Sequence, residues 1–238
     1  MGERFRLIFL KSTGTEKSLE GGYSPSHDLE EAHGMKFPSP EVVPSETFAS
    51  QAMLQQAEAD LKHSDAKVRS LAIQYLERVD SSIALPLLQE RVSDRDAGVR
   101  AQALSSLMRF EVPLVGPLLK KCLRDRDPQV RMTALRGMFK RGEKIDLNLL
   151  LQLLSDESPG VRRKLATLLG WAHVEGVLPI LTELSKDQDA RVRQAALVSL
   201  TMLYPEESED RLLEAMNDSD RDLRQWAMAA LKKRAARP

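Results

Sequence analysis

Hydrophobic and polar positions follow a helical spacing from about residue 46 onward. A Val or Leu followed by Arg recurs along this part of the chain, with apolar residues four and eight positions further on. After Val99, for example, these positions hold Ala103 and Leu107, and the three side chains share one face of a helix. A second apolar run precedes each such helix, as in IALPLLQERV. The pattern predicts pairs of helices joined by short turns.

The Val-Arg or Leu-Arg pair returns six times at a constant interval of 31 residues. An unbroken period in this range is typical of stacked supersecondary units that bury their apolar faces against one another. We therefore predict an all-α fold, an α-solenoid of about six two-helix repeats over residues 46–238. The apolar members of the six pairs are Val68, Val99, Val130, Val161, Val192 and Leu223.

A short polar residue stands three positions before each of these Val or Leu residues. Asp and Ser accept hydrogen bonds from the free amides of a first helical turn, so these residues are predicted helix caps. We expect each following Arg to reach back toward acidic residues of its own or an adjacent turn, so that stacking builds a ladder of charges. The predicted cap and ladder residues are Asp65, Arg69, Asp96, Arg100, Asp127, Arg131, Ser158, Arg162, Asp189, Arg193, Asp220 and Arg224.

Residues 1–45 have a different composition. Most of this segment is rich in Ser, Gly, Pro and charge, a mixture that buries too little surface to offset the entropy of ordering. Its apolar run LIFL is shorter than the core of a signal peptide or a membrane span. We predict a flexible N-terminal leader over residues 1–45 in front of a repeat domain over residues 46–238.

The charge of the chain is balanced, with 35 Lys and Arg against 35 Asp and Glu in 238 residues. This balance gives no reason to expect nucleic acid or a membrane surface as the partner. The single cysteine, Cys122, cannot form an internal disulfide, which favours a reducing compartment. We predict a cytoplasmic protein without a membrane span that is monomeric unless bound to its partner.

The sequence lacks the motifs of catalysis and of metal binding. The repeated D-x-D has a place in calcium loops, but position twelve of such a loop requires Glu, and it is Ser105 when counted from Asp94. The four His residues show no ligand spacing, and there is no nucleophile elbow, phosphate loop or dinucleotide fingerprint. We predict no catalytic residues, no metal site and no cofactor.

The residues of these turns, as in DRDPQVRMTA, resemble the signature D-x-D-P-x-V-R-x-x-A of the HEAT-repeat family, in the short bacterial form named after phycobilisome lyase subunits. The resemblance covers residues 46–238. It implies an interaction scaffold, the role of most members, while a minority attach or detach bilins and a distantly related class excises damaged DNA bases. Repeat four departs from the signature at Ser158, which retains a cap but puts one rung of the ladder in doubt.

The surface left for function is the outward face of the second helices, which line the concave side of a HEAT-like stack. This face carries a cluster of basic, aromatic and Met residues, and Arg, aromatic and Met residues are enriched at protein interfaces. For Phe139 and Trp171, packing between units is an equally good interpretation. The predicted partner-binding residues are Arg78, Met108, Arg109, Arg136, Phe139, Lys140, Arg163, Trp171 and Met202.

Three classes of function fit these observations. The leading prediction is a non-catalytic scaffold or adaptor whose concave groove binds a helix or an acidic segment of a partner protein. One alternative, implied by the resemblance alone, is a subunit of a bilin lyase. The other is a nucleic-acid-binding protein that uses the basic cluster, against which the neutral charge of the chain argues.

Overall fold

The computed structural model describes residues 48–110, 112–141, 146–172 and 174–236, and these residues form α-helices joined by turns, with no strand among them. The chain divides into two units, residues 1–42 and 43–238, and all of the described residues belong to the second. The predicted leader, residues 1–45, lies outside the described residues.

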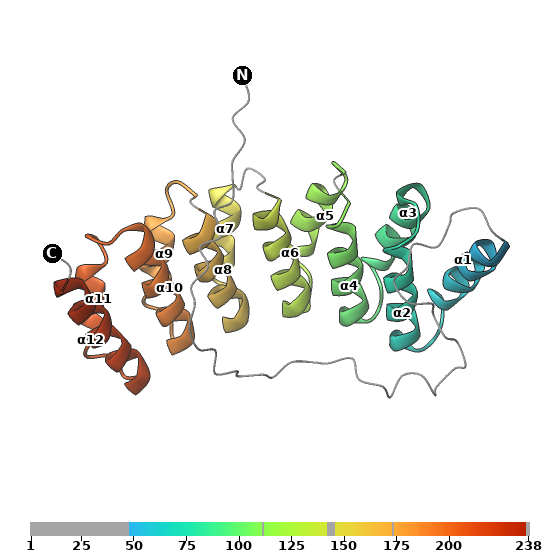
Figure 1. Ribbon diagram of the computed structural model, residues 1–238. Helices are drawn as coiled ribbons and strands as arrows, with labels where there is room; N and C mark the ends of the chain where they lie inside the picture. The colour runs from blue at the N-terminus through green and yellow to red at the C-terminus, as the bar shows by residue number, and fades with distance from the viewer. Residues whose placement is uncertain (1–47, 111, 142–145, 173, 237–238) are drawn as a thin grey trace, which may run out of the picture. The chain divides into compact units, whose positions relative to one another are not determined.

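Helices in the described part of the chain follow one another as six pairs (Figure 1). The longest has 15 residues, and none of those described combines the length and apolar content that crossing a membrane requires. The first helices of the six units are α1 (Phe48–Asp60), α3 (Ser81–Arg91), α5 (Val115–Cys122), α7 (Leu147–Leu153), α9 (Leu178–Leu184) and α11 (Glu209–Ala215). The second helices are α2 (Ala66–Leu76), α4 (Ala97–Leu107), α6 (Pro128–Lys140), α8 (Pro159–Ala172), α10 (Ala190–Leu203) and α12 (Arg221–Ala235).

Each second helix packs against the first helix of its own unit, and the second helices from α2 to α10 also pack against one another in sequence. The apolar face read from the sequence makes these contacts. In α6, Val130, Ala134 and Met138 are at most 1 % exposed, and burial of such residues in every unit supplies the main stabilising term of a repeat stack. These contacts confirm the predicted all-α solenoid of two-helix repeats.

Small residues let the second helices approach closely. A Cβ atom at Gly170 of α8 would lie 2.8 Å from Cβ and 3.2 Å from Cα of Ser199 in α10, so only glycine fits at this crossing. The hydroxyl of Ser199 donates a 2.8 Å hydrogen bond to the carbonyl oxygen of Ala166 in α8. Within the described ranges, the first helices do not pack closely against one another. Neighbouring units are therefore closest at their second helices, as on the inner side of a curved stack.

The last second helix is joined differently. Among the described helices, α12 packs against α11, and α11 contacts α10, but α12 does not continue the close packing of α2 to α10. The sixth unit thus packs against the fifth less closely than the earlier units pack against one another.

Candidate functional site

The turn before each second helix is closed by acidic side chains. At α6, the carboxylate of Asp127 accepts a 2.8 Å hydrogen bond from the amide of Gln129, and Pro128 occupies the first turn. Unit 4 has Ser158 where the other units have the capping Asp. The amide of Ser158 donates to Asp156 at 2.9 Å, as the corresponding amide does in units 2, 3, 5 and 6. Side chains that cap the other second helices in the manner of Asp127 are Asp65, Asp96, Asp189 and Asp220.

From unit 2 onward, a second Asp in each turn binds the Arg of the preceding unit. Nε and Nη2 of Arg131 donate to the two carboxylate oxygens of Asp156, 25 residues further on, both at 2.8 Å. Nη1 of Arg131 donates to the carbonyl oxygen of Asp125 in its own turn, also at 2.8 Å. Each guanidinium therefore closes one turn and binds the next unit. The same bidentate pair joins Arg69 to Asp94, Arg100 to Asp125, Arg162 to Asp187 and Arg193 to Asp218.

The predicted ladder includes the capping Asp of each turn, but the carboxylate that pairs with Arg stands two residues earlier. Since Asp156 supplies the rung of unit 4, the replacement of the capping Asp by Ser158 removes no rung. The available signal was the recurrence of these earlier Asp residues at the repeat interval. They are Asp94, Asp125, Asp156, Asp187 and Asp218.

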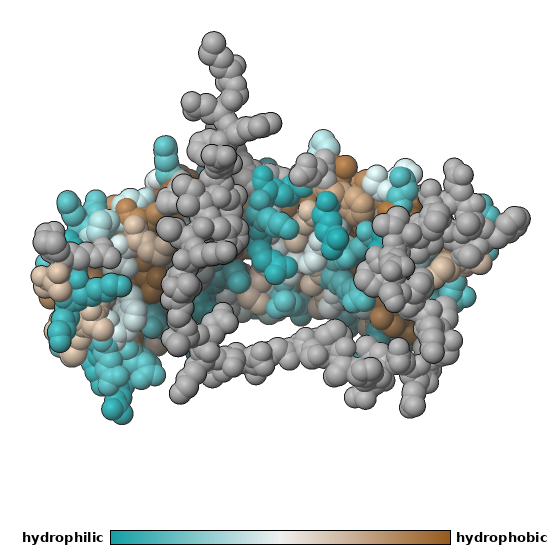
Figure 2. Space-filling model, viewed as in Figure 1, coloured by the Kyte–Doolittle hydropathy of each residue, from teal (hydrophilic) through white to brown (hydrophobic). Residues whose placement is uncertain are grey.

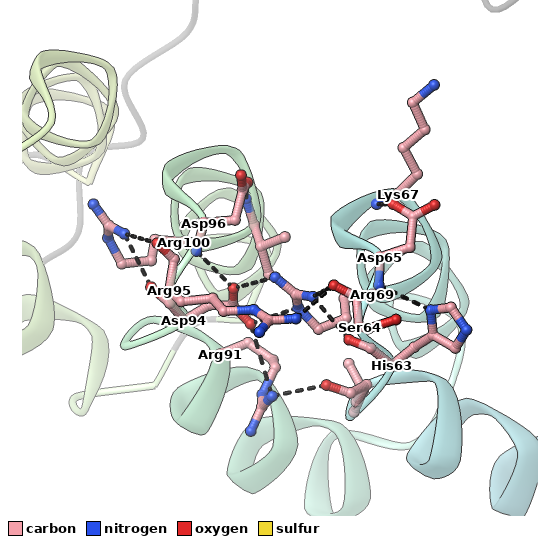
Figure 3. Close-up of polar contacts among 12 residues, drawn as sticks. His63, Ser64, Asp65, Lys67, Arg69, Arg91, Asp94, Arg95, Asp96 and Arg100 are labelled. Carbon is pink, nitrogen blue, oxygen red and sulfur yellow. Dashed lines mark hydrogen bonds and ion pairs between the residues drawn. The ribbon is translucent and has the colours of Figure 1, made fainter.

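The N-terminal end of the ladder is shown in Figure 3, where Arg69 lies between the turn of unit 1 and Asp94 of unit 2. In unit 1, His63 stands where later units have the pairing Asp. Its Nδ1 accepts the amide of Asp65 at 3.0 Å, so it closes the turn as the other Asp residues do. The residue 25 positions before His63 is Pro38 rather than Arg, so the sequence interval of the ladder does not extend before unit 1.

The C-terminal end of the ladder lacks the second half of the pair. Arg224 donates from Nη1 to the carbonyl oxygens of Asp218 and Ser219, at 2.7 and 3.0 Å. No carboxylate of the described chain receives its Nε or Nη2. Arg224 therefore contributes turn closure without an ion pair between units.

Four of the ladder carboxylates have a pKa below that of free Asp. Burial alone would raise the pKa of Asp94, Asp125, Asp187 and Asp218, but the hydrogen bonds from their Arg partners and from a backbone amide, with the nearby Arg charges, hold each pKa below its usual value. These four side chains are 3 to 13 % exposed. The pairs are thus buried, charged and fully hydrogen-bonded, which is the form in which an ion pair stabilises a fold.

We expect the free energy of unfolding to stay constant from neutral pH down to about 5 and to fall as the pH drops further. A carboxylate whose pKa is lower in the folded than in the unfolded chain contributes its full stabilisation above the unfolded value of about 3.9. It loses that contribution as the pH falls through the folded pKa. Urea unfolding monitored by circular dichroism between pH 7 and 3 measures this. Asp125→Asn removes one such group and should flatten the dependence; an unchanged dependence would contradict the assignment.

The outward face of the second helices carries most of the predicted binding residues. Trp171 is 71 % and Met202 is 54 % exposed, and both stand ten positions after the Val of their unit. Met108 and Phe139, one position earlier in the repeat, are half-buried against the core, and the Met108 sulfur lies against Gly137 of α6. Met108 therefore packs between units, and Phe139 packs against the core. The exposed row at position ten is Arg78, Arg109, Lys140, Trp171, Met202 and Lys233.

Charge is distributed unevenly between the two layers of helices. The second helices α2, α4, α6, α8 and α10 contain no Asp or Glu at all. They carry Lys and Arg beyond the paired ladder residues, notably Arg136 and Lys140 on α6 and Arg163 and Lys164 on α8. The face of the repeat domain that Figure 2 shows has hydrophilic residues around α5 and α6 and apolar patches near α9 and α10. The second-helix layer is therefore basic although the whole chain is neutral.

The largest hollow described on the first-helix side is lined by groups that the fold already uses. An open hollow of about 670 Å³ lies beside Arg100, Lys120 and Asp125, of which Arg100 and Asp125 pair with each other. Cys122 lines it, and burial raises the pKa of this thiol to about 11, so the thiol is protonated at neutral pH. Across the described residues, no three His, Cys, Asp or Glu side chains lie together as metal ligands would.

Known proteins with similar sequences or structures are also built from helical repeats. A family model for HEAT repeats matches residues 52–138 and 147–232. A chain in the complex of CpcE and CpcF of phycocyanin lyase from Nostoc sp. PCC7120 is similar, with a TM-score of 0.51 and 23 % identity over 83 % of this chain and 80 % of that one. YibA of Escherichia coli is similar with a TM-score of 0.58 and 20 % identity over 81 % of this chain and 77 % of that one. No curated protein matches the sequence. Because the HEAT-repeat model accounts for most of the chain, the protein belongs to the HEAT-repeat family.

Proposed function

We propose that this protein is a non-catalytic, cytoplasmic scaffold that binds a partner protein on the outward face of its second helices. One observation carries the proposal, the exposure of Trp171 to 71 % in the middle of that face. A Trp side chain gains most from burial, and exposed aromatic residues on a rigid surface are frequent hot spots of protein interfaces. The repeated charged residues of the turns are already used by the fold.

The neighbourhood of Trp171 supports the same reading. Met202 on the adjacent helix is 54 % exposed and Val198 is 36 % exposed, so apolar surface extends from α8 to α10. Exposed apolar surface rimmed by polar residues is typical of interaction sites. Arg136 and Lys140 on α6 provide such a rim on one side.

The proposal is tested by placing a photo-crosslinking amino acid at one position of the full-length protein in its native cells. Replacement at Trp171 should give a covalent adduct with a partner protein. Replacement at Lys120, an exposed residue of α5 on the other layer, is the matched control and should give none. Adducts formed from Lys120 alone would place the binding surface on the first helices and reject the proposal.

We expect the double variant Trp171→Ala with Arg136→Glu to lose its partner while remaining folded. Truncation of an interface Trp costs about 2 kcal/mol or more, roughly a thirtyfold loss of affinity, and the charge reversal adds repulsion toward an acidic partner. Both side chains are exposed, so no cavity is opened in the core. Pull-down of the crosslinked partner, with thermal melts of each variant, measures the effect.

The control for this variant is Gln89→Ala with Lys120→Glu, which changes exposed residues of first helices in the same way. It should bind the partner as the wild type does. A folded concave-face variant that still captures the partner would reject this face. A large drop in its melting temperature would instead assign Trp171 a structural role.

Nucleic-acid binding is the second candidate, because the second-helix layer from α2 to α10 has basic residues and no acidic ones. A salt-dependent shift of labelled duplex DNA would support it. The bilin-lyase alternative has only a likeness of fold behind it, and a bound chromophore would appear as visible absorbance of the purified protein.

A further inference from the structure

Two parallel rows of exposed or half-buried side chains cross α6, α8 and α10. The rows stand six and ten positions after the Val of each unit, so that they lie one helical turn apart on every helix. The α6 end of both rows is cationic and the α10 end is apolar. We call this surface the graded face, and its residues are Arg136, Thr167 and Val198 in one row and Lys140, Trp171 and Met202 in the other.

Within the described ranges, no carboxylate pairs with the cations of the graded face. Neither Arg136 nor Lys140 makes a hydrogen bond or ion pair with any part of the chain that the structure describes. The helices α4, α6, α8 and α10 around them contain no Asp or Glu. A binding partner therefore meets unneutralised positive charge at α6, and a segment with carboxylates there gains complementary electrostatics and faster association.

At the apolar end of the graded face, we expect the partner to present an apolar side chain instead of a carboxylate. Trp171, Val198 and Met202 are 71, 36 and 54 % exposed, and they come from two helices held in close contact at Gly170 and Ser199. Such a surface gains most from burying an aromatic or aliphatic anchor of the partner. Carboxylates and an apolar anchor must then be separated by the distance from α6 to α10.

That distance fixes the spacing in the partner. Packed helices lie about 8–10 Å apart, so two steps from α6 to α10 amount to roughly 16–20 Å. An extended chain rises about 3.1–3.4 Å per residue, and about six residues cover this span. Side chains six apart face the same way both in a β-strand and in a polyproline II helix.

The width of the graded face favours an extended segment over a helix. Its two rows are about 6 Å apart, since four helical residues rise by that amount, whereas a helix with its side chains is about 10–12 Å wide. We infer that the graded face binds an extended segment of the partner protein with acidic residues over α6 and an apolar anchor about six residues away over α8 and α10. This inference rests on the proposed function and specifies its partner.

Labelled synthetic peptides test the inference, with fluorescence anisotropy measured on the full-length protein. The probe carries two glutamates and, about six residues away, two leucines, with a Ser- and Pro-containing spacer that prevents helix formation. The probe should bind at least about tenfold more tightly than either of two control peptides. In the first control the spacer is cut to about two residues, and in the second lysines replace the glutamates. Equal binding of the three peptides would overturn the inference.

Variants assign the two ends of the segment. Arg136→Glu with Lys140→Glu should weaken the glutamate peptide at least about tenfold and create binding of the lysine peptide. Met202→Ser should weaken binding of the glutamate peptide to the wild-type face and of the lysine peptide to the charge-reversed face. It should not change which of the two peptides each face prefers. The matched control, Lys120→Glu with Lys121→Glu on exposed positions of α5, should leave the glutamate peptide bound as before. A charge-reversed variant that gains no lysine peptide would overturn the assignment.

The outcomes separate this inference from the proposed function. Crosslinking at Trp171 without any preference among the peptides would retain the scaffold and reject the acidic segment. Crosslinking confined to Lys120 would reject both. Tighter binding of a single-stranded oligonucleotide than of the glutamate peptide, with a steep loss in salt, would reject the acidic segment in favour of nucleic acid.

Discussion

Replacing Arg131 with alanine is expected to lower the free energy of unfolding by about 3–5 kcal/mol. The side chains of Arg131 and its partner Asp156 are 7 and 6 % exposed, so the substitution leaves a buried carboxylate without its guanidinium. It also removes the hydrogen bond that Nη1 donates to the carbonyl oxygen of Asp125. Both losses fall at the middle of the stack, where solvent cannot replace them.

Two variants separate the ion pair from the other roles of these turns. Arg224→Ala removes only the turn-closing hydrogen bonds, because no described carboxylate pairs with Arg224, and it should cost about 1 kcal/mol. Asp127→Ala removes a helix cap, which is worth about 1 kcal/mol. Urea unfolding of the three variants gives the comparison. If Arg131→Ala is no more destabilising than Arg224→Ala, the pairing between units does not hold the stack together.

Gly170→Ala should destabilise the protein by about 1–3 kcal/mol through overpacking. The new methyl group would meet Cβ of Ser199 at 2.8 Å and its Cα at 3.2 Å. Because the Cα belongs to the backbone of α10, no rotamer change relieves the contact and the two helices must separate. Separation also lengthens the hydrogen bond from Ser199 to the carbonyl oxygen of Ala166. Thermal melting of the purified variant measures the cost.

Gly137→Ala is the matched comparison. Its methyl group would meet the Met108 sulfur and Leu119 side-chain carbons, which belong to flexible side chains that can turn away, so we expect a smaller cost. A double-mutant cycle adds Ser199→Gly to Gly170→Ala. The two substitutions should compensate each other by about 0.5 kcal/mol or more. Additive effects would show that the α8 and α10 crossing tolerates the methyl group.

The sequence predicted the helix pairs and most caps because both depend on local rules. Apolar spacing and the capping Asp residues act within one turn of one helix. The pairing of Arg131 with Asp156 joins residues 25 positions apart, and its geometry exists only once two units have stacked. For that reason the sequence indicated a partner in the same or an adjacent turn without identifying which Asp it is, although the pairing Asp residues recur at the repeat interval.

The outward face of the second helices, where we propose that the partner binds, was predictable to within one position of the repeat. Residues ten positions after the Val point outward, as Lys140 and Trp171 do, whereas Phe139 at position nine is half-buried against the core. Neighbouring residues of a helix point in directions about a quarter of a turn apart. The spacing of apolar residues does not locate the edge of a helix face more accurately than that. The separation of charge between the layers was also missed, because a balanced total conceals where the carboxylates lie.

The joint between the fifth and sixth units has a mechanical consequence. From α2 to α10, neighbouring units are held both by helix packing and by a bidentate ion pair, but α12 leaves the packed layer, and the pair of Arg193 with Asp218 remains. Bending is easiest where fewest contacts resist it. We therefore expect the sixth unit to move relative to the fifth more readily than the earlier units move relative to one another, also when a partner is bound on α6 to α10.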